Sequence, residues 1–140
     1  MYKILLPIDS GGLCALHLES VKNIASKFKA EILLLHVIEY DFNSYTVSLE
    51  AGAVPNDDFD KAYQEFIDVP KEFLTDNGIK VDVIIELGKP ANIILDRCEK
   101  ENCDMIMMCT HGMSLPKRFL LGSVTNKVVH HAKVPVLVLR

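Results

Sequence analysis

Five short apolar runs recur along the chain, and longer segments with helical periodicity separate them. The runs are KILLPID, EILLLHVIE, KVDVIIEL, DMIMMCT and VPVLVLR. Continuous apolar runs of this length are typical of strands that are buried on both faces, as in a parallel sheet. The third run half alternates, because Asp82 interrupts it. The pattern therefore predicts five strands.

Between the runs, apolar residues return every three or four positions, which predicts helices with one buried face. These segments cover residues 18–28, 56–77, 91–98 and 124–132. Pro70 falls inside the second segment. We expect it to kink or split that helix, because its nitrogen has no hydrogen to donate and its ring clashes with the preceding turn.

Strands and helices alternate from one end of the chain to the other. This order predicts a doubly wound α/β fold with a five-stranded parallel sheet and four helices. A length of 140 residues suggests a single domain over 1–140. Residues 40–58 have no regular pattern, and we expect a long surface loop there.

Charge is distributed unevenly along the chain. The net charge is −4, yet residues 105–140 hold five basic residues and no acidic one. A mildly acidic protein is a poor candidate for general nucleic-acid binding, but its basic quarter can receive a small anion. Residues 39–72 hold nine acids against two bases, which favours a surface for a protein partner over a lid on phosphates.

The apolar segments and the cysteines indicate in which cellular compartment the protein is expected. No apolar run approaches the roughly 18 residues that a membrane span needs, and MYKILLPIDS is interpreted as a first strand rather than a signal peptide. Four scattered cysteines, Cys14, Cys98, Cys103 and Cys109, form no dense framework. We therefore expect reduced thiols in a cytoplasmic protein.

Cys98 and Cys103 are five residues apart on a predicted helix, so we expect them to face different ways. Neither a zinc site nor a CxxC redox site is spelled out by the spacing. The expected role of these cysteines is that of small buried or half-buried side chains.

Ligands of doubly wound sheets bind beyond the carboxyl ends of strands, where the strand order reverses. Three segments are expected to meet there. They are residues 7–12, 36–38 and 109–112.

Gly122 and Ser123 open the last predicted helix. Unpaired N–H groups at a helix start, with a glycine that admits close approach, can hold a phosphate, and Lys117 and Arg118 in the preceding loop could add charge. The alternative is structural: Gly122 is a turn and Ser123 is only an N-cap. The P-loop spacing is absent.

A longer motif contains these residues. Cys109, Thr110, His111 and Gly112 are followed by nine residues and then by Gly122 and Ser123. This arrangement resembles the G-x2-G-x9-G-[ST] signature of the universal stress protein family. KILLPIDS, AEILLLHVIE and the ending LLGSVTNKVVHHAKVPVLVLR are also similar to that family. The resemblance covers the chain apart from the variable loop around 40–58.

The resemblance implies strand order 3-2-1-4-5, in a fold like that of the adenine nucleotide alpha hydrolases, and usually a dimer. It also implies binding of ATP, or of AMP or ADP, with Mg²⁺ as an accompanying ion. Asp9 and Val37 would hold the adenine side, whereas the ribose and phosphates would contact Gly112, Gly122, Ser123 and Val124. The expected set is completed by Pro7, Ile8, Cys109 and His111.

Cys109 departs from the family motif, whose first position is glycine. A side chain there could crowd the nucleotide or only narrow the pocket. The competing hypothesis is therefore a dimeric interaction protein that binds no nucleotide and has a structural 109–123 loop. A third and weaker one is an adenylating enzyme, which DSGGLCA suggests only faintly.

No catalytic residues or metal ligands are predicted. Asp9 is expected to accept a hydrogen bond, His36 to lie in the core or at an interface, and His111 to orient its loop. His130 and His131 are adjacent on a helix and point in different directions. Without a nucleophile–base pair, hydrolysis of a bound nucleotide should be slow at most.

The last strand is apolar and ends the pattern with no segment to cover it. Pro135 suits an edge strand, and a bare apolar edge tends to pair with another chain. We expect a homodimer through Val134, Val136 and Val138, which is also the arrangement that the family resemblance implies.

Overall fold

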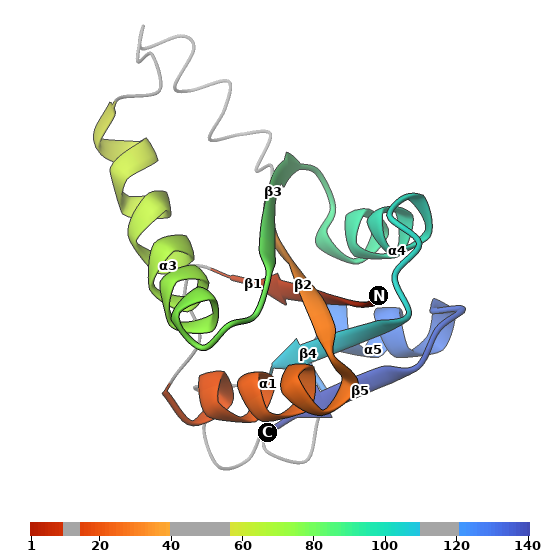
Figure 1. The fold of residues 1–140 in the computed structure, drawn as a ribbon. Helices are drawn as coiled ribbons and strands as arrows, with labels where there is room; N and C mark the ends of the chain where they lie inside the picture. The colour runs from red at the N-terminus through yellow and green to blue at the C-terminus, as the bar shows by residue number, and fades with distance from the viewer. Residues whose placement is uncertain (10–14, 40–56, 110–120) are drawn as a thin grey trace, which may run out of the picture.

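The computed structural model describes residues 1–9, 15–39, 57–109 and 121–140 (Figure 1). Strands and helices alternate through these residues as the sequence predicts. In chain order they are β1 (Tyr2–Ile8), α1 (Ala15–Phe28), β2 (Ala30–Ile38), α3 (Asp57–Asp76), β3 (Val81–Leu87), α4 (Pro90–Lys100), β4 (Met105–Cys109), α5 (Ser123–His131) and β5 (Val136–Leu139).

The five strands form one sheet in the order β3-β2-β1-β4-β5, which confirms the expected topology. Every described pair of neighbours is parallel. β1 lies at the centre, with Ile8 opposite His36 of β2 and with Ile4 opposite Met105 of β4. The carboxyl ends of the strands therefore share one edge of the sheet.

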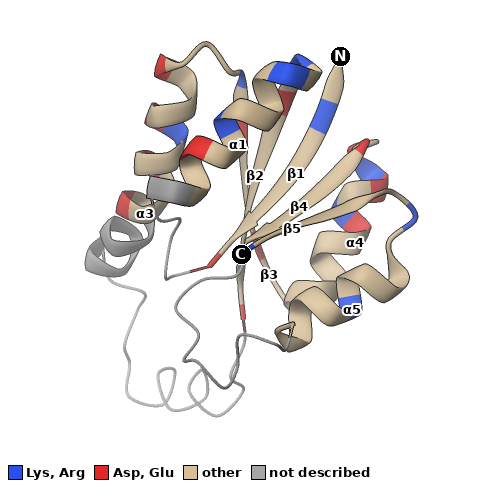
Figure 2. Ribbon diagram, turned by 90° about the horizontal axis from the view of Figure 1, so that it is seen from below, with Lys and Arg blue, Asp and Glu red and all other residues tan. Residues whose placement is uncertain are grey.

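Two apolar clusters hold the helices to opposite faces of this sheet. One cluster joins Val21 of α1 and Leu74 of α3 to the sheet, and the other joins Ile94 of α4 and Val128 of α5 to it. Figure 2 shows the resulting three layers, with α1 and α3 on one side and α4 and α5 on the other. We name these faces the α1/α3 face and the α4/α5 face.

Alternation along each strand explains why the apolar runs are continuous. In β1, Ile4 and Leu6 belong to the cluster on the α1/α3 face, whereas Leu5 belongs to the cluster on the α4/α5 face. All three are fully buried. Fully burying one such side chain contributes about 1.5–3 kcal/mol, so the central strand anchors the fold.

α3 continues as one helix through Pro70, so Pro70 does not split it, contrary to one of the two expected effects. Proline removes only one intrahelical hydrogen bond, the one its missing N–H would have donated. Pro70, Ile67 and Leu74 are all buried along this helix. The apolar burial of this face offsets the lost bond.

The end of α4 corrects the expectation about its two cysteines. Asn102 adopts a left-handed conformation with φ 53°, and its N–H donates to the carbonyl of Glu99 at 3.2 Å. The N–H of Cys103 donates to the carbonyl of Cys98 at 2.9 Å. These two bonds form a Schellman motif, which turns the chain back over the last helical turn. Cys103 therefore lies beyond the helix and shares a buried cluster with Cys98.

Ion pairs gather at the opposite edge of the sheet, where the strands begin. Glu31 of β2 accepts from Lys80 at 2.8 Å and faces Lys3 of β1 at 3.5 Å. Lys80 also lies 3.5 Å from Asp82 of β3, and the backbone N–H of Lys3 donates to the Asp104 carboxylate at 2.8 Å. We call these residues the amino-edge network.

No helix among the described residues is long and apolar enough to cross a membrane.

Candidate functional site

The carboxyl edge of the sheet is where the expected site residues would meet. β1 leads through α1 to β2 on one side, and β4 leads through α5 to β5 on the other, so the strand order reverses between β1 and β4. The register pairs Leu5 with Ile106. The same offset, continued to the ends of the strands, places Cys109 beside Ile8.

The central strand brings three expected residues to this edge. Pro7 and Ile8 end β1, and Asp9 follows directly with an exposed side chain. Val37, near the end of neighbouring β2, packs against the cluster on the α4/α5 face. Asp9 and Val37 thus come from adjacent strands, as a shared binding edge requires.

His36 connects the ends of β1 and β2. Its ring nitrogen Nδ1 lies 3.0 Å from the carbonyl oxygen of Ile8 and, because that oxygen can only accept, the ring must donate. The ring also meets Phe66 of α3 edge to face, with centroids 4.8 Å apart. His36 is buried, which places it in the core, one of its two expected positions. The structure adds that His36 positions the carboxyl ends of β1 and β2 relative to each other.

A second buried histidine had no signal in the sequence. His17 lies near the start of α1 and is only 4% exposed. The apolar pattern of this helix begins at Leu18, so His17 lies just outside the predicted stripe. A polar residue one position before an apolar face is indistinguishable from an exposed one on periodicity alone.

Cys109 ends β4 with a half-buried side chain. It packs against the cluster on the α1/α3 face together with Leu139 of β5. Val37 and Val124, by contrast, pack against the cluster on the α4/α5 face. The sulfur at the departing motif position is therefore directed to the opposite side of the sheet from these two valines.

The start of α5 has the features of an anion site. Gly122 is the N-cap, with φ −58° and ψ 157°, and its carbonyl accepts from Asn126 at 2.8 Å. Ser123 is the first helical residue, so its interpretation as the N-cap is wrong. The first turn carries no acid, and no side chain caps it. The N–H groups there present the positive end of the helix dipole.

The side chains after Gly122 divide between solvent and core. Ser123 is exposed, Val124 is half-buried, and Thr125 is 6% exposed. A crossover helix runs antiparallel to its strands, so this helix start lies at the carboxyl edge of the sheet. His111 and Gly112 of the motif lie outside the described residues, as do Lys117 and Arg118 of the same loop.

The described residues contain no cluster of three or more potential metal ligands, which are His, Cys, Asp and Glu side chains. His130 and His131 are exposed in the last turn of α5, far along the helix from Ser123. Among the described residues, the carboxyl edge of the sheet together with the start of α5 is suited to binding an anion.

A family comparison decides the assignment of the chain. The model of the family described as "Universal stress protein family" matches residues 1–140. The chain belongs to the universal stress protein family. The match spans both strand ends and the Gly122–Ser123 helix start.

Curated universal stress proteins match over nearly the full chain. Universal stress protein MJ0577 of Methanocaldococcus jannaschii is 34% identical over 158 residues, which cover 100% of this chain and 96% of the relative. Universal stress protein MJ0531 of the same organism is 31% identical, with 99% and 81% covered. Universal stress protein YxiE of Bacillus subtilis is 27% identical, with 99% and 98% covered.

Solved universal stress protein structures share the fold. The structure of MJ0577 superposes with a TM-score of 0.78 at 34% identity and covers 99% of this chain and 94% of that one. A universal stress protein from Archaeoglobus fulgidus, solved in complex with dAMP, has a TM-score of 0.71 at 15% identity, with 100% and 98% covered. At that identity the second match speaks for the fold alone.

Proposed function

We propose that this universal stress protein binds an adenine nucleotide at the carboxyl edge of its sheet and acts as a nucleotide-responsive regulator. The observation that carries the proposal is the start of α5, where a glycine N-cap and a first turn without acids leave N–H groups for an anion. The dAMP complex of the Archaeoglobus fulgidus relative supports the choice of adenine nucleotide. The family match supports a role in stress response.

Each side of the nucleotide has candidate partners in this chain. Asp9 and Val37, from adjacent strands, would hold the adenine side. Gly122, Ser123 and Val124 would hold the ribose and phosphates, with the Ser123 hydroxyl free to rotate toward a phosphate because that side chain is exposed. His111 and Gly112 complete the proposed loop. Mg²⁺, when bound with ATP, would neutralise phosphate charge.

The structure offers a test of fit at Cys109. Its side chain packs with the cluster on the α1/α3 face, whereas Val37 and Val124 pack on the α4/α5 face. A cysteine in this orientation leaves the α4/α5 side of the edge open. This arrangement favours retained binding over the alternative in which the 109–123 loop is only structural.

Efficient turnover is not part of the proposal. Ser123 and Asp9 have polar side chains at the edge, but a hydrolase would need a positioned base that activates water. We therefore expect stoichiometric binding, with nucleotide hydrolysis slow at most. Rapid steady-state hydrolysis by the pure protein would contradict this part of the proposal.

Nucleotide binding can be tested by native mass spectrometry and calorimetry with ATP, ADP and AMP. The wild-type chain is expected to bind about one nucleotide per chain. Ser123→Ala should weaken binding about tenfold or more, because a hydrogen bond to a charged group contributes about 1.5–3 kcal/mol. Its melting temperature should change little, because Ser123 does not cap the helix.

Matched variants sharpen this test. Ser123→Thr keeps the hydroxyl and should retain affinity within a fewfold. Thermal melting of Ser123→Ala shows whether any loss of binding arises from unfolding. A wild-type chain that takes up none of the three nucleotides would overturn the proposal and favour a dimeric interaction protein.

We infer a homodimer in which β5 pairs with the same strand of a second copy. β5 is an edge strand of the sheet, and all four of its residues, Val136–Leu139, are half-buried. An apolar edge of this kind is completed by pairing. The acidic stretch of 39–72 is proposed as the surface for a protein partner.

A further inference from the structure

Cys98 and Cys103 are brought together by the Schellman motif that ends α4. The N–H of Cys103 donates to the carbonyl of Cys98 at 2.9 Å, and the left-handed Asn102 makes this return possible. Each thiol lies close enough to the other to affect its pKa. Neither forms a disulfide, and each is 5% exposed. Two sulfur donors therefore converge at one point.

Both thiols line a pocket of about 240 Å³ on the α4/α5 face. Its apolar wall comes from α4, β4 and the connection between α5 and β5. These residues are Leu95, Ile106, Ala132 and Val134. A cavity of this size admits small molecules and ions, and both cysteines belong to its wall.

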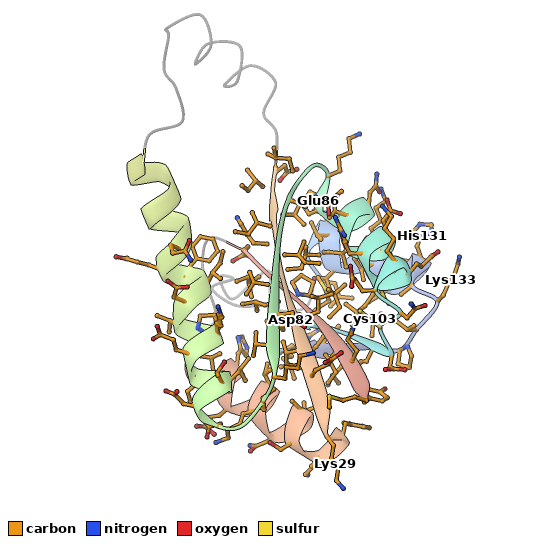
Figure 3. All side chains as sticks on the ribbon, turned by 45° about the horizontal axis from the view of Figure 1, so that its top comes forward. Lys29, Asp82, Glu86, Cys103, His131 and Lys133 are labelled. Carbon is orange, nitrogen blue, oxygen red and sulfur yellow. The ribbon has the colours of Figure 1, made fainter. Side chains whose placement is uncertain are left out.

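Charged groups surround the pair. Glu99 and Lys133 line the pocket and form an ion pair at 2.9 Å. The ammonium of Lys3 acts on Cys103 from the other side, where it donates to the carbonyl of Glu101 at 3.2 Å. Figure 3 shows Cys103 and Lys133 on the side of the sheet that α4 and α5 cover. Anionic and cationic groups thus both lie within reach of the sulfurs.

We propose that Cys98 and Cys103 form a two-thiolate site for a soft monovalent d10 cation, with Cu(I) as the representative ion. Two thiols and one cation give a bis-thiolate complex and release two protons. The complex carries one negative charge, and the ammonium of Lys3 is the cationic group that acts on Cys103. Soft thiolate ligands select Cu(I) over hard cations.

The donor count restricts the choice of ion. Among the described residues, no third His, Cys, Asp or Glu joins these thiols to form a metal-binding group. Structural zinc takes four ligands, whereas Cu(I) is stable with two thiolates in a line. The pair therefore suits an ion with low coordination number and a preference for sulfur.

Direct oxidation of the pair is a weaker hypothesis. Burial raises the pKa of Cys98, and burial also raises the pKa of Cys103 to about 12. The thiolate is the nucleophile in thiol–disulfide exchange, so these thiols react slowly with small disulfides. A coordinated cation instead displaces the protons outright.

The site can be tested with anaerobic Cu(I) titration against a chromophoric chelator, followed by native mass spectrometry. The parent for this test is C14S/C109S, in which only the two paired thiols remain. It is expected to bind one Cu(I) per chain, with a neutral-mass increase of one copper less one hydrogen, because two protons leave and one positive charge is added. C98S and C103S in that parent should each bind at least tenfold more weakly, with folding checked by thermal melting.

A second measurement needs no substitution. In the wild-type chain, Cys98 and Cys103 should be labelled slowly by excess maleimide, and Cu(I) should slow this labelling further at both residues together, as followed over hours by peptide mass spectrometry. Equal Cu(I) affinity of C98S, C103S and their parent would overturn the proposal. So would a parent that takes up no copper or becomes two hydrogens lighter, since the pair would then be a core contact or a disulfide site.

Discussion

At the scale of one residue, substitution of Cys109 tests whether the residue type at a motif position or the packing around it decides ligand binding. Cys109→Gly would restore the family's glycine. We expect nucleotide affinity to change by less than threefold, because the sulfur packs on the α1/α3 face, away from Val124. The protein should lose about 1–2 kcal/mol of stability, because a strand glycine has more freedom when unfolded and fills less space. Calorimetry and urea unfolding check both values.

The opposite outcome for Cys109→Gly is equally informative. A tenfold gain in nucleotide affinity would show that the sulfur crowds the ligand, and the orientation inferred from packing would be wrong for the bound state. Cys109→Ala serves as the control. It shortens the side chain but keeps the Cβ, so it separates crowding by sulfur from flexibility of the backbone.

Glu31 in the amino-edge network should make stability depend on pH. The hydrogen bond from Lys80 is the main cause that holds the pKa of Glu31 below its ordinary value of 4.5. A lowered pKa stabilises the folded state above the unfolded pKa, and this stabilisation is lost as pH falls through the folded pKa. Glu31→Gln should therefore cost about 0.5–1 kcal/mol at neutral pH.

The difference between Glu31→Gln and wild type should shrink once the pH falls below about 4.5. Urea unfolding at a series of pH values measures it. Glu65→Gln, at an exposed position of α3, is the control and should stay within about 0.5 kcal/mol of wild type at each pH. A constant gap between Glu31→Gln and wild type would rule out the ionised carboxylate as its source.

At the scale of elements, the end of α1 predicts opposite stability effects for the same substitution at two nearby lysines. Lys29 follows α1 in a left-handed conformation with φ 51°, and Figure 3 shows it at the end of that helix. Lys29→Gly should stabilise the protein by about 0.5–1 kcal/mol, because glycine adopts this conformation without strain. Lys27→Gly, within the helix, should destabilise it by about 1 kcal/mol.

Thermal melting of the two lysine variants provides the measurement. Both substitutions remove the same exposed side chain and the same charge, so their difference isolates the backbone conformation. A destabilised Lys29→Gly would mean that the lysine side chain contributes more than the strain that it imposes.

Strands and helices could be predicted from the sequence where a single local rule, such as the apolar pattern, determines them. The five apolar runs became the five strands. The inner strands β1, β2 and β4 have continuous apolar runs because they are buried on both faces, whereas β3 at the edge of the sheet carries the exposed Asp82. Pro70 does not split α3, because burial along the helix offsets one lost hydrogen bond. Tertiary packing, which no local pattern contains, decided that case.

The candidate site was predictable only in part. The topology places Asp9, directly after β1, near Val37 at the end of the neighbouring β2, as the order of apolar runs and the family resemblance implied. The direction of the Cys109 side chain depends on the register of β4, which sequence does not provide. Likewise, the meeting of Cys98 with Cys103 depends on the left-handed Asn102, a conformation that periodicity arguments ignore.

At the scale of the whole molecule, the open edge of β5 allows a clean test of the dimer. The carbonyl of Pro135 accepts from Ile106 of β4 at 3.0 Å. Alternation along a parallel strand then directs the N–H of Val138 to the open edge. Val138→Pro should abolish dimerisation and leave pairing with β4 intact, because proline removes only that outward donor. Light scattering at micromolar concentrations measures the mass.

Val138→Ala is the matched control for the dimer. It shortens the same side chain but keeps the N–H, so the dimer should persist. A monomeric wild type, or a Val138→Pro protein that is still dimeric and folded, would show that β5 does not mediate assembly.

The amino-edge network has a consequence for how this protein can diverge. Lys3, Glu31 and Lys80 join the beginnings of three strands, and the seven residues of β1 separate them from the opposite edge by about 20 Å. Substitutions that far apart act additively on stability. Mutations near Asp9 or Ser123 that alter ligand preference can therefore accumulate without weakening the ion pairs of the amino-edge network. One scaffold can tolerate a succession of ligands.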